Sequence, residues 1–303
     1  MDYNNEYESI FVDHGINLGT ASVANFYRNH GVFLGISREI VNGLYVYAGV
    51  SYSEISSVHE LQSYDFYEQF EIFKTNEALE FNTFVQVSPS FSIFFRPFQK
   101  YHLEPKRKIV LPSKWPNFSI STEHGVQGIF NSTYKYTNLN FGFTQRIKLG
   151  ILGVSQYSLN GSKTYGEGSD IFLATRSFIA SDKYTVQNPI TSFSLLDTTI
   201  FTRELAIDAH YIHHFQGALM NQFPLLRKLR LRSTIGTNFL YSSEQDIFHL
   251  EAFCGVSRPF KMFGEKISVG IFPIVKIGNT GDVFNAGFKI GLRYYYPVTR
   301  EWD

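Results

Sequence analysis

FNAGFKIGLRYYY, residues 284–296, places an apolar side chain at every second position. Successive side chains leave a β-strand on opposite faces, so this alternation predicts a strand. At about 3.4 Å per residue the strand would span roughly 40 Å, well beyond the usual five or six residues. One face carries no charge, whereas the other carries Lys289, Arg293 and glycines. A strand of this kind suits a transmembrane barrel, in which one face contacts lipid and the other faces a polar lumen. The alternative interpretation is a long strand of a soluble β-sandwich.

The composition fits a membrane-spanning β-sheet. Of the 303 residues 17% are aromatic, with 30 Phe and 19 Tyr, and transmembrane barrels carry aromatic girdles at both interfaces. Basic and acidic residues both number 27, so the net charge does not point to nucleic acid. The only cysteine, Cys254, excludes an internal disulfide framework. The sequence has no apolar run of 18 residues that would predict a membrane helix.

The N-terminal sequence MDYNNEYES has neither the basic region nor the apolar core of a signal peptide. Because an outer-membrane protein needs such a signal, we expect the chain to be a fragment or a processed product of a longer protein.

Alternation along the chain predicts an all-β fold, a transmembrane antiparallel up-and-down β-barrel that occupies residues 1–303 as one domain. The barrel has about 14 strands in this chain, either closed alone or as part of a larger barrel. Asn42–Gly43 predicts a hairpin turn, Pro89–Ser90 predicts a second tight turn, and Pro273 predicts either a bulge or a weakened pairing. The expected strands are 15–27, 31–41, 44–57, 77–88, 91–103, 117–130, 133–147, 151–161, 169–180, 200–215, 228–241, 247–260, 265–277 and 283–296.

The connections between these strands sort by length. With the end of the last strand in the periplasm, the long loops 59–76, 104–116 and 181–199 fall on the outer side. The tight turns at 42–43, 89–90, 131–132 and 262–264 fall on the periplasmic side. Short periplasmic turns and long outer loops are the known asymmetry of outer-membrane barrels, and a soluble sandwich has no reason for it.

Four stretches carry a family resemblance: NGLYVYAGVSYS (42–53), KIVLPSKWPNFSISTEHGVQGIF (108–130), QRIKLGILGVSQYSL (145–159) and HHFQGALMNQFPLLRKLRLR (213–232). They resemble the C-terminal β-barrel of an uncharacterised outer-membrane family, whose full-length members carry an N-terminal carboxypeptidase-regulatory-like domain. The barrel is also distantly similar to the Omp85 class. The resemblance implies the outer membrane of a Gram-negative bacterium and a role in transport, translocation or outer-membrane assembly. This sequence departs from the family by lacking the N-terminal domain and by ending in REWD, so that Tyr296 or Trp302 would provide the terminal aromatic residue.

Two polar clusters have a functional and a structural interpretation. Glu204, Asp208, His210 and His214 share one face of the strand at 200–215, while His213 lies near its end at the membrane interface. They could form a metal or acid–base site, but a lumen also needs paired polar side chains, and we favour the lumen. The basic run 227–232 could bind nucleic acid. Its basic residues alternate with leucines, which again favours basic side chains that face the lumen. The predicted lumen-facing residues are Arg146, Glu204, Asp208, His210, His214, Arg230, Arg232, Lys266, Lys276, Lys289 and Arg293.

The sequence contains no pattern that specifies catalysis. It has neither a G-x-S-x-G motif, nor a Ser–His spacing that specifies a nucleophile and base, nor a phosphate-binding glycine loop. Cys254 alternates with apolar residues and is expected to face lipid. We therefore expect no catalytic residue, cofactor or metal. A hydrolase that uses the 204–214 cluster, a passive porin and a soluble all-β binding module are the alternatives.

The connection at 216–226, QGALMNQFPLL, is long and apolar although it falls on the periplasmic side. Ala218–Met220 could begin a helical turn, and Pro224 would limit its extent. We expect Leu219, Met220, Phe223 and Leu225 to contact a periplasmic protein or the protein's own N-terminal domain. An amphipathic turn lying at the lipid interface is the alternative. The expected partners are thus the lipid bilayer and a periplasmic protein or domain, and no nucleic acid.

Overall fold

The computed structural model describes residues 7–11, 27–57, 81–105, 107–111, 113–166, 176–180, 185–186, 188–196, 200–215, 217–262 and 265–297. The predicted strand at 15–27, apart from its last residue, and the predicted loop at 59–76 lie outside the described residues. Among the described helices, none is long and apolar enough to cross a membrane.

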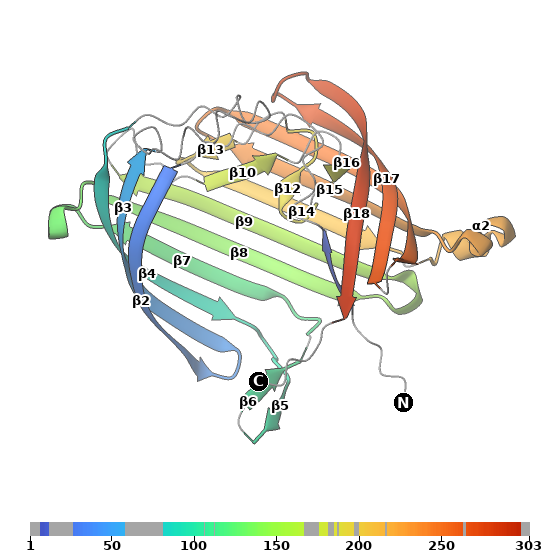
Figure 1. Cartoon of the computed structure of the whole chain (residues 1–303), viewed down its shortest axis with the longest axis horizontal. Helices are drawn as coiled ribbons and strands as arrows, with labels where there is room; N and C mark the ends of the chain where they lie inside the picture. The colour runs from blue at the N-terminus through green and yellow to red at the C-terminus, as the bar shows by residue number, and fades with distance from the viewer. Residues whose placement is uncertain are drawn as a thin grey trace.

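One strongly curved antiparallel sheet dominates the fold (Figure 1). It has 13 described strands in the order β1-β18-β17-β16-β15-β14-β9-β8-β7-β4-β3-β2, and β11 pairs with β18 beside this path. Within the described residues β1 and β2 stand at the two ends of the order, so the pairing forms an open path. The strands are β1 (Tyr7–Phe11), β2 (Tyr27–Val41), β3 (Leu44–Ser57), β4 (Phe84–Phe95), β7 (Asn117–Gly125), β8 (Tyr136–Lys148), β9 (Val154–Gly166), β11 (Thr185–Val186), β14 (Ala206–His214), β15 (Arg232–Ser242), β16 (Ile247–Met262), β17 (Glu265–Gly278) and β18 (Phe284–Pro297).

Smaller elements lie around and within this sheet. Strands β5 (Tyr101–Glu104) and β6 (Arg107–Val110) form a separate hairpin, and β10 (Arg176–Ala180) pairs with both β12 (Ser192–Phe193) and β13 (Ile200–Thr202). The helical elements described are the 3-10 turns η3 (Ile129–Asn131), η4 (Gly150–Leu152) and η6 (Met220–Gln222) and the six-residue helix α2 (Pro224–Leu229).

The strongest sequence signals are confirmed. Asn42 and Gly43 form the turn between β2 and β3, where Gly43 has a positive φ of 87° that glycine adopts without steric cost. The stretch at 284–296 is the long strand β18, which pairs with β17 from Phe284 opposite Ile277 to Tyr295 opposite Lys266. An all-β fold built on one large, mostly antiparallel sheet is therefore established, with 13 strands in it among the described residues.

The predicted turn at Pro89–Ser90 is wrong, because β4 runs straight through both residues. Proline lacks a backbone donor, which usually breaks a ladder. Here β4 begins to pair with β7 only at Ser90, opposite Glu123, so the missing N–H of Pro89 interrupts no bond on that side. Before Pro89 the edge of β4 is occupied by the connection 126–135, in which Thr133 N donates to the Val85 carbonyl (2.9 Å).

The continuous β4 also corrects the predicted sides of the loops. Strand direction alternates along the order, so the turn 42–43, the connections 96–116, 149–153 and 215–231 and the end of β18 share one end of the sheet, here called the hairpin end. The predicted long loop at 104–116 lies at the hairpin end and contains β6, rather than sharing an end with 181–199. The turn at 131–132 lies at the opposite end, with the connections 243–246 and 279–283.

Pro273 does weaken a pairing, as predicted. The β16–β17 ladder omits the pairs between Phe253–Ile274 and Val256–Ile271, although the register is unchanged. The neighbouring Phe272 is 3% exposed and faces the inner side of the curve, where glycines leave room for its ring. A Cβ atom on Gly255 would lie 2.2 Å from that ring, and one on Gly291 would lie 2.3 Å from it.

Residues 176–180 and 188–196 lie inside the curved sheet (Figure 1), and together with β11 (185–186), which pairs with β18, they are here called the inner segment. Figure 1 shows β10 and β12 within the curve, near the end opposite the β5–β6 hairpin. Phe178, Phe193 and Leu196 pack against Ala206, Leu240 and Ile247 of the wall in one cluster. A second cluster joins Val186, Ile190 and Leu195 to Ile212, Phe253, Phe272 and Ile274. The prediction of a polar external loop at 181–199 is therefore wrong for the described part of this segment.

Charged residues point inward and apolar residues outward over most of the sheet. Lys276 and Glu251 on the inner face are 1% and 0% exposed, whereas Ile271 and Phe288 on the outer face are 61% and 77% exposed. Cys254 is exposed on the outer face, as its alternation predicted. Further exposed outer-face residues are Leu34, Ile36, Phe91, Phe95, Ile120, Leu139, Phe141, Ile235, Phe248, Val275, Ile277 and Ile290.

Candidate functional site

The candidate site is a row of polar side chains on the inner face of β14, β15 and β16. His210 pairs in register with Asn238, and Asn238 pairs with Glu251. Side chains at paired positions leave a sheet on the same face, so these three lie side by side across three strands. All three are nearly inaccessible to solvent, which is rare for charged residues unless they are paired.

Asp208 lies next to this row, and its carboxylate has three polar neighbours. Its carboxylate accepts a hydrogen bond from Asn160 Nδ2 (2.6 Å) on β9 and one from Arg176 Nη2 (3.2 Å) on β10 of the inner segment. His210 Nε2 lies 3.4 Å from the same carboxylate. The side-chain amide of Asn238 then lies 3.0 Å from His210 Nδ1. Asp208 therefore joins the wall to the inner segment as well as to its neighbours in the wall.

Glu251 binds the backbone of the inner segment directly. Its carboxylate accepts hydrogen bonds from Ser194 N (2.8 Å) and Leu195 N (2.5 Å), and His249 Nε2 lies 2.8 Å from it. Lys276 donates to the Leu195 carbonyl (3.2 Å) and to the Thr280 carbonyl (2.7 Å). The curved sheet, here called the wall, thus supplies an acceptor for the backbone amides and a donor for the backbone carbonyl of residues 194–195. This arrangement holds a peptide rather than leaving a reactive group free.

A second attachment lies at the end of the sheet, at Glu244 in the β15–β16 connection. Its carboxylate accepts hydrogen bonds from Arg203 N (2.6 Å) and from the Thr202 hydroxyl (2.9 Å), which follow the inner segment. Partial burial opposes ionisation of Glu244, but these hydrogen bonds outweigh it and lower the pKa of the carboxyl below its usual value.

Five of the predicted lumen-facing residues lie on the inner face of the curved sheet. Asp208, His210, Lys276 and Lys289 are buried there, and His214 is half-buried with its Nδ1 3.0 Å from the Thr234 hydroxyl. Arg232 begins β15, opposite Ser257, and is half-buried. Lys266 and Arg293 lie in β17 and β18, and their side chains are outside the described part of the structure.

Three predicted lumen residues lie elsewhere. Glu204 falls in a bend between β13 and β14, because the expected strand at 200–215 is broken there, and it is exposed beside Lys163 (3.8 Å). Arg230 ends α2 in a left-handed conformation (φ 52°) and belongs to no strand, since α2 replaces the start of the expected strand at 228–241. Arg146 keeps the inner-face parity but is exposed at the hairpin end of β8.

His213 lies near the end of β14, and its side chain is buried. Its Nδ1 lies 2.7 Å from the Ser155 hydroxyl and its Nε2 lies 2.9 Å from the Leu152 carbonyl. Leu152 lies in the β8–β9 connection and Ser155 is the second residue of β9, so His213 anchors this connection to β14. The side chain has two hydrogen-bond partners and no free nitrogen for catalysis.

The connection at 216–226 contains two helical elements in its described part. The predicted helical turn is present as η6 (Met220–Gln222), which ends before Pro224. Pro224 then begins a second helix, α2, as its first residue, because the missing N–H of proline is unneeded at that position. Leu219, Phe223 and Leu225 are 42%, 59% and 82% exposed. Figure 1 shows α2 projecting from the side of the sheet at the hairpin end. These side chains are available for contact, as a docking segment requires.

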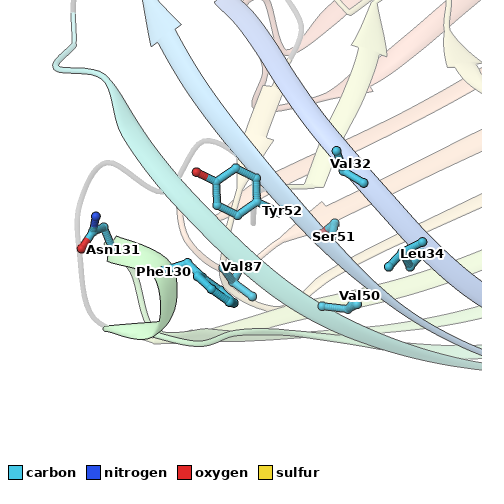
Figure 2. Close-up of a pocket in the computed structure, with 8 residues that line it drawn as sticks. All are labelled: Val32, Leu34, Val50, Ser51, Tyr52, Val87, Phe130 and Asn131. Atoms are coloured by element: carbon cyan, nitrogen blue, oxygen red, sulfur yellow. The ribbon is translucent and has the colours of Figure 1, made fainter.

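The described part of the outer face has a hollow near the end opposite the hairpin end. A cavity of about 560 Å³ lies between β2, β3 and β4 and the turn η3, which folds back over the sheet. Figure 2 shows its lining of Val32, Leu34, Val50, Ser51, Tyr52, Val87, Phe130 and Asn131. The lining is almost wholly apolar and contains no ionisable acid or base, so it offers space for an apolar group and no reactive chemistry.

The arrangement does not form a recognisable catalytic or metal centre among the described residues. No group of three or more His, Cys, Asp or Glu side chains there could hold a metal ion. The carboxylates of Asp208 and Glu251 already accept several hydrogen bonds, and the wall histidines are bonded to neighbouring side chains. Strand alternation would have assigned His249 and Glu251 to the inner face, opposite Leu250 and Ala252. Their contact with residues 194–195 had no signal in the sequence.

A known protein family covers most of the chain. A family model described as the C-terminal domain of a family of unknown function, DUF5686, matches residues 2–256. The chain belongs to this family. The match to the DUF5686 C-terminal domain ends within β16, and it includes Asp208, His210 and Glu251 of the polar row. No curated protein matches the chain.

Proposed function

We propose that this DUF5686 C-terminal domain is an integral β-barrel protein of the outer membrane of a Gram-negative bacterium. The observation that carries the proposal is the inverted polarity of the sheet. Buried Lys276, Lys289 and Glu251 lie on its inner face, and large apolar side chains such as Ile271 and Phe288 are exposed on its outer face. A protein surrounded by water rarely exposes so extended an apolar surface, whereas a barrel surrounded by lipid requires it.

The hydrogen bonding of the backbone is also compatible with strands that cross a bilayer. Lipid cannot satisfy backbone N–H and C=O groups, so only helices and closed barrels cross a bilayer. In this proposal the described open path from β1 to β2 is completed by a barrel closure. The lipid bilayer is then the principal partner, and the resemblance to outer-membrane families with an N-terminal regulatory-like domain, and distantly to the Omp85 class, supports the same location.

Within this proposal the inner segment closes the lumen of the barrel. The protein then has a role in transport, translocation or assembly and is not a passive porin. The inner segment supports this choice, because its aromatic and aliphatic residues pack against the wall in two clusters. Glu251 and Lys276 bind its backbone from the wall. A porin needs an open aqueous lumen, whereas this interior is occupied over the length of these contacts.

The first experiment tests the barrel and the closed state together. The full chain, refolded in detergent, should migrate differently on an SDS gel before and after boiling, and should show a β-type circular dichroism spectrum. In planar bilayers the native protein should conduct little, and Glu251→Ala should raise the conductance because the amides of Ser194 and Leu195 lose their acceptor. A monomer fully soluble without detergent would refute the barrel. A large steady conductance of the native protein would favour the porin.

A hydrolase that uses the 204–214 cluster is the second candidate function, and the geometry argues against it. Glu204 is exposed and apart from Asp208 and His210, while His213 is held by Ser155 and a backbone carbonyl. Esterase and phospholipase assays on the folded protein test this directly. Hydrolysis that disappears in His210→Gln would contradict the non-enzymatic proposal.

The exposed 219–225 segment is proposed as the contact with a periplasmic protein or with a preceding domain. Changing Leu219, Met220, Phe223 and Leu225 to Ser should leave the heat-dependent gel shift intact and abolish capture of that partner. The matched control changes Asp282 and Val283, which are exposed in the connection 279–283 at the opposite end, to Ser. Loss of the gel shift in the first variant alone would show that the segment is needed for folding instead.

A further inference from the structure

The connection 96–116, which follows β4 at the hairpin end, is held against the sheet as a fixed structure. Gln99 is buried, and its amide nitrogen lies within hydrogen-bond distance of Glu39 Oε1 (3.1 Å), Asn42 Oδ1 (3.0 Å) and the Tyr45 hydroxyl (2.8 Å). Lys108 forms an ion pair with Glu39 (2.5 Å). Glu39 is therefore engaged on the β2–β3 side of this connection.

On its other side the connection encloses a cavity of about 450 Å³ against the end of β8. The lining consists of Phe98, Lys100, Ser113, Lys114, Trp115, Arg146 and Lys148. Four of these seven residues are cations, and none is an acid. Like charges around one cavity raise its positive potential and attract an anion.

Two aromatic side chains form the apolar wall of the cavity. The rings of Phe98 and Trp115 lie 4.7 Å apart, and Lys114 Nζ lies 5.8 Å from the Trp115 ring. Phe98 adopts a left-handed backbone conformation (φ 52°), which bulky residues rarely adopt and which structures retain mostly at functional sites. Gln145 Nε2 donates to the Lys114 carbonyl (3.0 Å), so the loop is fixed onto β8.

We propose that this cavity binds a small molecule in which a phosphate group is attached to an aromatic or aliphatic body. The planar guanidinium of Arg146 suits bidentate contact with phosphate oxygens, and the ammonium groups of Lys100 and Lys114 add point charges. The Phe98–Trp115 wall receives the apolar body. The volume falls in the usual range for small-molecule sites, about 300–1,000 Å³. A phospholipid headgroup and a soluble organic phosphate share this chemistry, and the inference does not depend on the proposed membrane location.

Trp115 provides a direct reporter, because the chain has only two tryptophans. In a Trp302→Phe background the fluorescence of the full chain in zwitterionic detergent then comes from Trp115. Phenyl phosphate is titrated first, followed by inorganic phosphate. Mixed micelles that contain phosphatidylglycerol, with phosphatidylcholine as the uncharged comparison, form the lipid arm.

We expect saturable quenching by phenyl phosphate, with weaker binding of inorganic phosphate because it lacks the apolar body. Lys114→Gln and Arg146→Gln should each weaken binding about tenfold, the effect expected for loss of one charge-assisted hydrogen bond. The matched control Lys135→Gln removes an exposed cation at the opposite end of the sheet and should bind like the native protein. A response to phosphatidylglycerol alone assigns the site to a headgroup, and a response to phenyl phosphate assigns it to a soluble phosphate.

The inference is overturned if neither probe changes the fluorescence at millimolar concentration. It is also overturned if Lys114→Gln, Arg146→Gln and the control Lys135→Gln all bind phenyl phosphate equally well. Binding would then reflect the overall charge of the protein rather than this cavity. An unaltered heat-dependent gel shift in each variant shows that a loss of binding is not a loss of folding.

Discussion

Replacing Glu251 by Gln should loosen the inner segment while leaving the wall of the sheet intact. Glu251 is fully buried, and its two oxygens accept the amides of Ser194 and Leu195 at 2.8 and 2.5 Å. Gln keeps the size of the side chain but turns one acceptor into a donor. One amide then faces another N–H group, so about one charged hydrogen bond is lost, worth about 1.5–3 kcal/mol, and one buried donor is left without an acceptor, at a further cost of about 1–3 kcal/mol.

Hydrogen exchange of the amides at 194 and 195 measures this change locally. Together the two losses lower the opening free energy of the segment by about 2.5–6 kcal/mol, so exchange should accelerate by at least about 70-fold. Glu204→Gln is the matched control, because that carboxylate is exposed and its ion pair with Lys163 is long. Exchange that changes less than twofold in Glu251→Gln, with native gel mobility, would refute the assigned role of Glu251.

Three further predictions test the packing, the topology and the pH response. Gly291→Ala would place a methyl group 2.3 Å from the Phe272 ring, so overpacking should lower the free energy of unfolding by about 1–3 kcal/mol in a urea titration, and an unchanged midpoint would contradict this packing. In a cysteine-free background, cysteine at Asp282 should react with an impermeant thiol reagent on intact cells, whereas cysteine at Lys228 should react only after permeabilisation; the opposite result would invert the orientation. Because the folded state lowers the pKa of Glu244, the ionised carboxylate stabilises the fold above its ordinary pKa of 4.5. This stabilisation is lost as the pH falls through the lower pKa of the folded state. Glu244→Gln should therefore make the free energy of unfolding less dependent on pH in this acid range, and an unchanged pH dependence would refute the assignment.

Local patterns in the sequence were sufficient for the last three strands, β16, β17 and β18. Their alternation is clear, and the described side chains on their two faces have the burial that the alternation predicts. The hairpin at Asn42–Gly43 was equally predictable, because the conformation of a two-residue turn depends on its own residues. Pro89 misled the prediction for a non-local reason, since whether a proline interrupts a ladder depends on where the neighbouring strand begins to pair.

The interior could not be predicted because it depends on contacts between distant parts of the chain. Residues 181–199 are mostly polar, which resembles a solvated loop, yet Phe193 and Leu196 within them are buried against β14 and β15. The attachment of Ser194 to Glu251 joins positions 57 residues apart, and only the folded structure shows it. The cationic cavity at Arg146 likewise combines a loop and a strand end whose adjacency has no sequence pattern.

The proposal that lipid surrounds this sheet is tested most directly by collision accessibility along β17. Single nitroxide labels are placed in turn at Ser268, Val269, Gly270 and Ile271 and in the matching positions 274–277, in protein reconstituted into liposomes. Oxygen, which concentrates in lipid, should relax the labels at Val269, Ile271 and the outward positions 275 and 277, with minima at the intervening inward positions. Preferential relaxation of those outward labels by a water-soluble nickel reagent would contradict the membrane barrel.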